Sequence, residues 1–125
     1  MTIHTVPDAV RNAELLKNYQ TLNEIVQLED NWNGNGASKF AKELLDTVRS
    51  IIENLFRQPE IYLSSRNSIQ LEYINQAGDY LEFEIFENGM NHMFSYSHTG
   101  KMRTSWISAH MINHEVICFY EYQVS

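Results

Sequence analysis

The spacing of apolar residues changes near Glu60, from a period close to four before it to a period of two after it. Apolar residues three and four apart predict amphipathic helices over 7–29 and 39–56. Ser38 is expected to be the N-cap of the second helix, and Pro59 follows its end. The alternation after Glu60 predicts four or five sequential antiparallel strands. The predicted fold class is therefore α+β, with two N-terminal helices packed on one face of a meander sheet.

The first hairpin is predicted at Gln76-Ala77-Gly78, which suits a type I turn with its glycine in the left-handed conformation. This turn sets Leu71 opposite Phe83 and Ile69 opposite Ile85. Both pairs are apolar, so they are expected on the face that the helices cover.

The second hairpin is predicted at Asn88-Gly89, because this dipeptide favours a two-residue turn. Such a turn pairs Phe83 with Phe94 and Leu81 with Tyr96. These pairs are again apolar and are expected on the core face.

A third hairpin is predicted at His98-Thr99-Gly100, and a final strand is predicted over 115–124. The segment 108–114 is compatible with a helix or a loop. The third turn sets Tyr96 against Met102 and His92 against Trp106. His92 is thereby expected on the core face, as a partly buried histidine with its hydrogen bonds satisfied.

The balance of charge limits the partners of this chain. Its 16 acidic and 9 basic residues give a net charge of −7 and an isoelectric point near 5.1. Duplex nucleic-acid binding needs a concentrated surface of lysine and arginine, so this balance argues against it. A protein partner with a basic surface is favoured instead. The length of 125 residues, 43% of them hydrophobic, predicts a single domain over 1–125.

Cys118 is the only cysteine, so no intramolecular disulfide can form. It lies in an apolar run predicted as a strand, where burial would raise the pKa of the thiol and make a nucleophile improbable. The residues from Met1 to Val10 contain no apolar run. Neither a signal peptide nor a membrane span is expected, and the predicted location is the cytoplasm.

Two glutamates face each other in the predicted sheet. The first hairpin places Glu72 directly opposite Glu82 on the face away from the core, with Gln70 beside Glu84. The second places Glu82 beside Ser95, and the third places Ser95 beside Arg103. The nearest cation in this row is therefore two strands away, at roughly 9–10 Å.

Three interpretations of these glutamates remain open. They can be solvated charges on an open face, which is the favoured interpretation because exposed like charges interact weakly. They can form a docking surface for a basic partner. Alternatively, Glu72, Glu82 and Glu84 can hold a divalent metal such as magnesium or manganese.

His110 and His114 have a spacing that a helix can present to one zinc ion. Glu115 follows the second histidine, whereas in the metalloprotease motif the glutamate follows the first. No third ligand is evident nearby, so solvated histidines are favoured over a zinc site.

Aromatic residues raise the question of a base-stacking platform for single-stranded RNA. The acidic charge opposes it, and most of these tyrosines are predicted on the core face, so buried aromatics are favoured. The residues concerned are Tyr73, Tyr80, Tyr96, Tyr120 and Tyr122.

The link between the two predicted helices contains Gly34-Asn35-Gly36, which could cradle an anion at a helix N-terminus. It lacks the preceding strand and the following lysine of such sites. A tight turn with Trp32 packed beneath it is favoured.

A series of motifs runs through the middle of the chain: Trp32-Asn33-Gly34-Asn35-Gly36-Ala37, a helix, Pro59, Gln70-Leu71-Glu72-Tyr73 and Leu81-Glu82-Phe83-Glu84-Ile85. Over about residues 25–90, this series resembles a group of small uncharacterised bacterial and phage proteins with the pattern N-W-D-G-x-G-A, helix, L-E-W and L-x-I-E-I. Asn33 stands where those proteins have aspartate, and Tyr73 where they have tryptophan. The resemblance implies a gene carried on mobile elements and no established activity.

The leading hypothesis is a non-enzymatic, cytoplasmic protein-binding module, such as an inhibitor, antitoxin, immunity or anti-defence protein of a mobile element. Its expected binding residues are Glu72, Glu82, Glu84, Trp32 and Asn33, and no cofactor is predicted. The alternative is a metal-dependent hydrolase or nuclease that uses the sheet glutamates. A third hypothesis is a homodimer in which the strand predicted over 116–124 pairs edge to edge.

Overall fold

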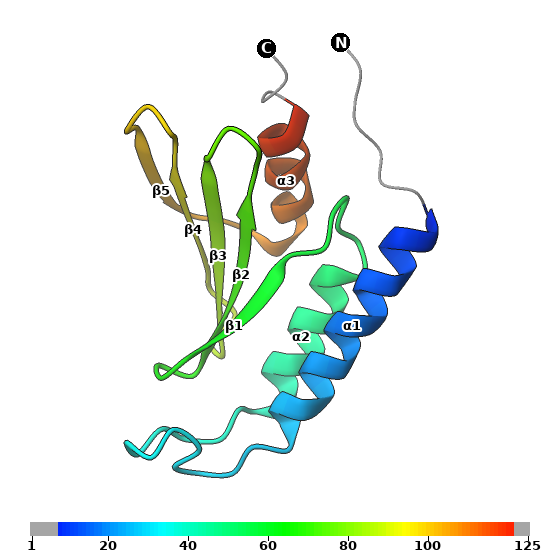
Figure 1. Cartoon of the computed structure of the whole chain (residues 1–125). Helices are drawn as coiled ribbons and strands as arrows, with labels where there is room; N and C mark the ends of the chain where they lie inside the picture. Colours follow the sequence, from blue (N-terminus) through cyan, green and yellow to red (C-terminus); the bar gives the residue numbers. More distant parts are fainter. Residues whose placement is uncertain (1–7, 122–125) are drawn as a thin grey trace.

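The computed structural model describes residues 8–121 of the chain (Figure 1). It is an α+β fold with an antiparallel sheet in the order β1-β2-β3-β4-β5. The elements are, in chain order, α1 (Asp8–Val26), α2 (Lys42–Ile52), β1 (Glu60–Ser64), β2 (Ser68–Ile74), β3 (Tyr80–Phe86), β4 (Asn91–Tyr96), β5 (Met102–Trp106), the short 3-10 helix η1 (Ala109–Met111) and α3 (Ile112–Glu121).

The three α-helices lie on the same side of the sheet, and the core fills the space between them (Figure 1). Val48 and Ile52 of α2, Phe83 and Ile85 of β3, and Ile112 at the start of α3 are completely buried. The two predicted N-terminal helices and the predicted meander are confirmed. The helical layer has a third member that the apolar spacing did not predict.

The second helix begins later than predicted, and Ser38 is not its N-cap. The N-cap is Ala41, whose side chain makes no capping hydrogen bond. Ser38 remains in the interhelical link, where its carbonyl oxygen accepts a hydrogen bond from Trp32 Nε1 at 3.0 Å. After Ile52 the chain leaves the α-helix through tighter turns, with Leu55 N donating to Ile52 O at 3.3 Å.

The register of the first and third hairpins is as predicted, whereas the second hairpin differs by one residue. Phe83 pairs with Met93 rather than Phe94, and Leu81 pairs with Ser95 rather than Tyr96. The turn contains three residues, because Phe86 N donates to Met90 O at 3.0 Å. Gly89 takes the left-handed position at φ 85° that closes such a turn.

A register change of one residue moves every side chain of the partner strand to the other face of the sheet. Met93 therefore belongs to the core, at 2% exposure. His92, Phe94 and Tyr96 point away from the helices, so the prediction of His92 on the core face is wrong. Tyr80, which pairs with Tyr96, likewise lies on the face away from the core.

The final strand predicted over 115–124 is wrong, because residues 112–121 form helix α3. Ile112, Val116 and Tyr120 are buried at intervals of four, which is the spacing of one helix face. Cys118 therefore lies on a helix. The segment 108–114, which the sequence made compatible with a helix or a loop, contains η1 and the first turn of α3. Residues 122–124 of the predicted strand, including Tyr122, lie outside the described residues.

Candidate functional site

The candidate site is the open face of the sheet, defined as the side chains of β1 to β5 that point away from the helices. No helix of residues 8–121 covers this face (Figure 1). The strand pairing arranges its side chains in rows that cross the sheet. The two central rows are Glu60, Glu72, Glu82, Phe94 and Thr104, and Tyr62, Gln70, Glu84, His92 and Trp106.

The first of these rows is acidic over three strands. Glu72 pairs with Glu82 as predicted, and Glu60 of β1 pairs with Glu72 on its other side. Within residues 8–121, no ion pair shorter than 4.0 Å links any of these three glutamates to a cation. The row therefore concentrates negative charge that the described residues do not neutralise.

The predicted compensation of this charge by Arg103 is wrong. The neighbour of Glu82 on β4 is Phe94 rather than Ser95, so Arg103 does not share a row with the glutamates. Arg103 lies on the helix side of the sheet and pairs with Glu115 of α3 at 3.6 Å. The register change thus removes the nearest cation from the acidic row.

The protonation of Glu72 reflects its crowded position. Burial raises the pKa of this carboxyl, the nearby Tyr80 hydroxyl lowers it, and the negative charge of Glu82 raises it. The Tyr80 hydroxyl donates to Glu82 Oε1 at 2.8 Å. Burial, together with this bond to Glu82, raises the pKa of Tyr80, so the hydroxyl remains a donor.

Glu84 differs from the other glutamates because its carboxylate is already engaged. It is buried, and both of its oxygens accept from Arg66 Nη2 at 2.9 Å. The Ser68 hydroxyl also donates to it. A buried carboxylate needs such partners, so Glu84 anchors the β1–β2 turn and is not free to bind a partner.

Aromatic side chains lie beside the acidic row on the β4 and β5 side of the open face. Trp106 packs edge-on against His92, with ring centroids 5.0 Å apart, and lies 6.0 Å from the ring of Phe86. Tyr80 lies 6.1 Å from Phe94. Sequence reasoning missed this cluster because the assumed two-residue turn placed its β4 members in the core.

Several large apolar side chains of this face remain accessible to solvent. The exposed residues of the strands are Tyr62, Ile74, Tyr96, Met102 and Trp106, and Met90 is exposed in the adjoining β3–β4 turn. Ile74, Tyr80, Tyr96 and Met102 share one row across four strands, and exposed apolar side chains gathered in this way are typical of an interaction site.

Trp32 and Asn33 do not join this surface. Trp32 packs against Phe40 with ring centroids 5.5 Å apart. Asn33 Oδ1 accepts hydrogen bonds from the backbone of Asn35 at 2.9 Å and of Ala37 at 3.2 Å. The link that carries them contacts the β1–β2 turn, where Asn67 Nδ2 donates to Lys39 O at 3.0 Å. Glu72 and Glu82 lie toward the opposite ends of their strands, away from the β1–β2 turn.

The described residues contain no preformed metal site. Within 8–121, no group of three or more histidine, cysteine, aspartate or glutamate side chains is placed to hold one ion. His114 Nε2 lies 3.6 Å from Cys118 Sγ, on the next turn of α3. Burial raises the pKa of the Cys118 thiol, as expected, although the residue is helical. The zinc and divalent-metal hypotheses thus gain no support from the arrangement of these side chains.

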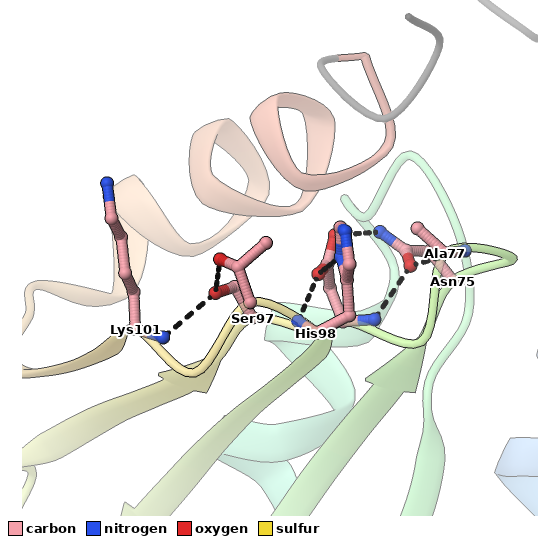
Figure 2. A network of polar contacts seen from close by, with 7 residues as sticks. Asn75, Ala77, Ser97, His98 and Lys101 are labelled. Atoms are coloured by element: carbon pink, nitrogen blue, oxygen red, sulfur yellow. Dashed lines mark hydrogen bonds and ion pairs between the residues drawn. The ribbon is translucent and has the colours of Figure 1, made fainter.

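A polar network joins the ends of two hairpins beside α3 (Figure 2). Asp79 Oδ1 accepts from the backbone N of His98 at 2.8 Å and contacts its Nδ1 at 2.7 Å, while Asp79 Oδ2 accepts from Asn75 Nδ2 at 3.1 Å. The backbone bond from His98, the Asn75 amide and the His98 ring lower the pKa of Asp79 from 3.8 to about 2. These hydrogen bonds connect the β2–β3 turn to the β4–β5 turn.

A groove next to this network, between α3 and the ends of β4 and β5, has a volume of about 500 Å³. Lys101 and Arg103 contribute its positive charge, and Phe119 contributes apolar surface. Arg103 is already paired with Glu115. Within residues 8–121, two buried side-chain atoms lack a hydrogen-bond partner: Arg57 Nε and Asn91 Oδ1. Neither residue lines the groove, so no unsatisfied buried atom points to a ligand there. The groove therefore offers a weaker binding signal than the open face.

Comparison of the chain with family models, with curated proteins and with solved structures found no match. The resemblance to small bacterial and phage proteins thus stays a prediction. Across residues 8–121, no helix is both long enough and apolar enough to cross a bilayer.

Proposed function

We propose that this protein is a small acidic binding module, acting in the cytoplasm, whose open face docks a protein partner rich in arginine. The observation that carries the proposal is the combination of an unneutralised glutamate row with exposed aromatic and methionine side chains on one uncovered sheet face. Interface centres are typically enriched in aromatic, methionine and arginine residues. The open face supplies the first two, and its charge favours a partner that supplies the third.

The acidic row gives the interaction its charge complementarity. Glu60, Glu72 and Glu82 span three adjacent strands at the sheet spacing of about 4.8 Å. Negative potential from such a row accelerates the association of a basic partner and orients it. A guanidinium matches a carboxylate through two parallel hydrogen bonds, which a lysine ammonium does not do.

The aromatic cluster strengthens the preference for arginine. Phe94 follows Glu82 in the same row, and Trp106 is 60% exposed two strands from Glu84. A guanidinium that reaches Glu82 can stack on the neighbouring ring, adding about 0.5–2 kcal/mol to the ion pair. Lysine-rich partners would gain the charge attraction without this stacking.

The mode of action fits an inhibitor, antitoxin, immunity or anti-defence protein. The resemblance implies only that the gene is carried on a mobile element, and the class of protein is inferred from the small size and the acidic surface of the chain. Such a protein would neutralise its target by covering a basic surface. Two of the expected binding residues, Glu72 and Glu82, are retained in this proposal. Glu84, Trp32 and Asn33 are assigned structural roles because their polar groups are satisfied internally.

The proposal is tested by affinity capture from a lysate of the native host with three baits. These are the natural protein, the face variant Glu72→Lys/Glu82→Lys, and the control variant Glu24→Lys/Glu43→Lys, which makes the same charge change on exposed helix positions. Wild type and control are expected to retain one stoichiometric protein, which is lost from the face variant and released as salt rises.

The purified partner then allows affinities to be measured. Each charge reversal is expected to weaken binding by about tenfold or more, because a like charge replaces a complementary one. If the face variant binds the partner as tightly as wild type does, the open face is excluded as the binding surface. A partner whose binding surface is acidic or uncharged would contradict the charge argument. Thermal unfolding of all three baits verifies that they are folded.

A further inference from the structure

Strand β5 forms one edge of the sheet, and its outer side has no partner strand in residues 8–121. All five of its residues are exposed. Edge strands of natural proteins are usually protected by charged residues, proline or bulges. Met102, Thr104 and Trp106, the alternate residues of β5, carry no charge.

The backbone groups of these three residues face away from the sheet. Along an antiparallel strand, residues that bond one neighbour alternate with residues whose N–H and C=O groups point the opposite way. Ser97 N donates to Lys101 O at 2.8 Å, and Ile107 N donates to Asn91 O at 2.9 Å. The odd-numbered residues from 101 to 107 are therefore turned toward β4. The backbone groups of the even-numbered residues are left pointing outward.

We propose that two copies of this chain pair through β5, antiparallel, about a two-fold axis at Thr104. In this register Thr104 faces Thr104 of the second copy, and Met102 faces Trp106 of the second copy on both sides of the axis. Each facing pair exchanges two backbone hydrogen bonds, because all three residues present outward donors and acceptors. The Trp106 carbonyl oxygen already accepts from the Ser105 hydroxyl at 3.0 Å, and its second lone pair serves the pairing. The occupant of the edge is thus a second copy of β5.

The side chains support this register on both faces. Met102 and Trp106 are 64% and 60% exposed, and the pairing brings each against the other, which removes apolar surface from water. On the helix side, Arg103 faces Ser105 of the second copy, so no like charges are directly opposed. Arg103 also keeps its ion pair with Glu115.

The arrangement makes the two five-stranded sheets continuous and places the two open faces on one surface. It replaces the predicted edge pairing of residues 116–124, which is incompatible with helix α3 over 112–121. The paired strands are short, so the interface is smaller than that of a permanent dimer, and a concentration-dependent equilibrium is expected.

Sedimentation equilibrium of the full chain, from micromolar concentrations to about 1 mM, tests the pairing. The average mass is expected to rise from 14.7 kDa toward twice that value. Thr104→Lys and Thr104→Glu are each expected to stay monomeric, because a residue on the two-fold axis faces its own copy and like charges repel. An equimolar mixture of these two variants is expected to restore the dimer.

The mixture distinguishes loss of the β5 interface from misfolding of the variants. A misfolded Thr104→Lys protein would not dimerise when Thr104→Glu is added, whereas a folded one would. Thr47→Lys, an exposed position on α2, is the control and is expected to dimerise like wild type. A 14.7 kDa species at every concentration would overturn the proposal. So would a dimer that survives both Thr104 substitutions, or a mixture that remains monomeric. Glu72→Lys/Glu82→Lys is expected to dimerise normally, so the outcome is independent of the acidic row on which partner binding is proposed to depend.

Discussion

Replacement of Glu72 by glutamine is expected to stabilise the protein at neutral pH. Asn75 N donates to Asp79 O at 3.2 Å, so these two residues form a hydrogen-bonded pair of the β2–β3 ladder. Hydrogen-bonded and non-hydrogen-bonded pairs alternate along an antiparallel ladder, which makes Glu72 and Glu82 a non-hydrogen-bonded pair. Side chains are closest in such pairs. Two charges about 6 Å apart at an effective dielectric constant of about 60 repel by roughly 0.9 kcal/mol, which salt reduces to about 0.5 kcal/mol. Glutamine removes this repulsion, and at position 82 it can still accept from Tyr80.

The pH dependence has a defined sign. The pKa of Glu72 is raised in the folded protein above its ordinary value of 4.5, chiefly by burial. The unfolded chain therefore ionises first as pH rises, and stability is lost between the unfolded and folded pKa values. The advantage of Glu72→Gln should be present at pH 7 and absent at about pH 3, where Glu72 is protonated and no longer repels its neighbour.

Urea denaturation of Glu72→Gln, Glu82→Gln and the double variant measures the effect. Each single change should add about 0.5 kcal/mol to the free energy of unfolding at pH 7, and the double variant should add little more, because one substitution already relieves the pair. Glu24→Gln on α1 changes the net charge equally and should be neutral. Destabilisation by Glu72→Gln, or simple additivity in the double variant, would refute the reasoning. If the stabilised variants also bind the partner less well, the protein keeps the Glu72–Glu82 pair for binding at the expense of stability.

Two further predictions concern the turns. Asp79→Ala should lower the free energy of unfolding by about 1 kcal/mol at pH 7, since it removes charge-assisted bonds that are partly screened by solvent. Folding lowers the pKa of Asp79 from 3.8 to about 2, so the ionised carboxylate stabilises the folded protein at any pH above 3.8. Urea titrations should show this stabilisation disappearing as the pH falls from 3.8 to about 2. Gly36→Ala should cost about 1 kcal/mol in thermal unfolding. Its φ of 86° disfavours a side chain although nothing lies within 4 Å of the added carbon, and an unchanged melting temperature would contradict this.

The contrast between the first two hairpins explains where sequence reasoning succeeded. The turn around Gln76-Ala77-Gly78 was predicted as a three-residue turn, and the pairing of Glu72 with Glu82 followed correctly. Asn88-Gly89 suits a two-residue turn and equally a three-residue turn with Gly89 in the left-handed position. The strand after it contains Met93, Phe94 and Tyr96, so either register places apolar residues in the core. Local composition could not choose between the two.

Helix α3 is a second case of the same ambiguity. The run from Val116 to Tyr120 is short and apolar, a pattern shared by buried strands and buried helix segments. Tyr120 packs edge-on against Tyr73 at 5.9 Å and under the guanidinium of Arg57 at 4.2 Å, contacts with residues far away in the sequence. Such contacts stabilise the helical alternative, and no short window of sequence contains them.

The sequence by itself determined the fold class, the presence of two N-terminal helices before an antiparallel meander, and the facing glutamates of the first hairpin, because side-chain periodicity and turn chemistry are local properties of the backbone. The tertiary structure alone decided which face the β4 aromatics occupy, that Arg103 turns to Glu115, and that Glu84 is satisfied by Arg66. These outcomes depend on a one-residue register and on packing between distant segments. Their energies arise only when the layers of the fold come together.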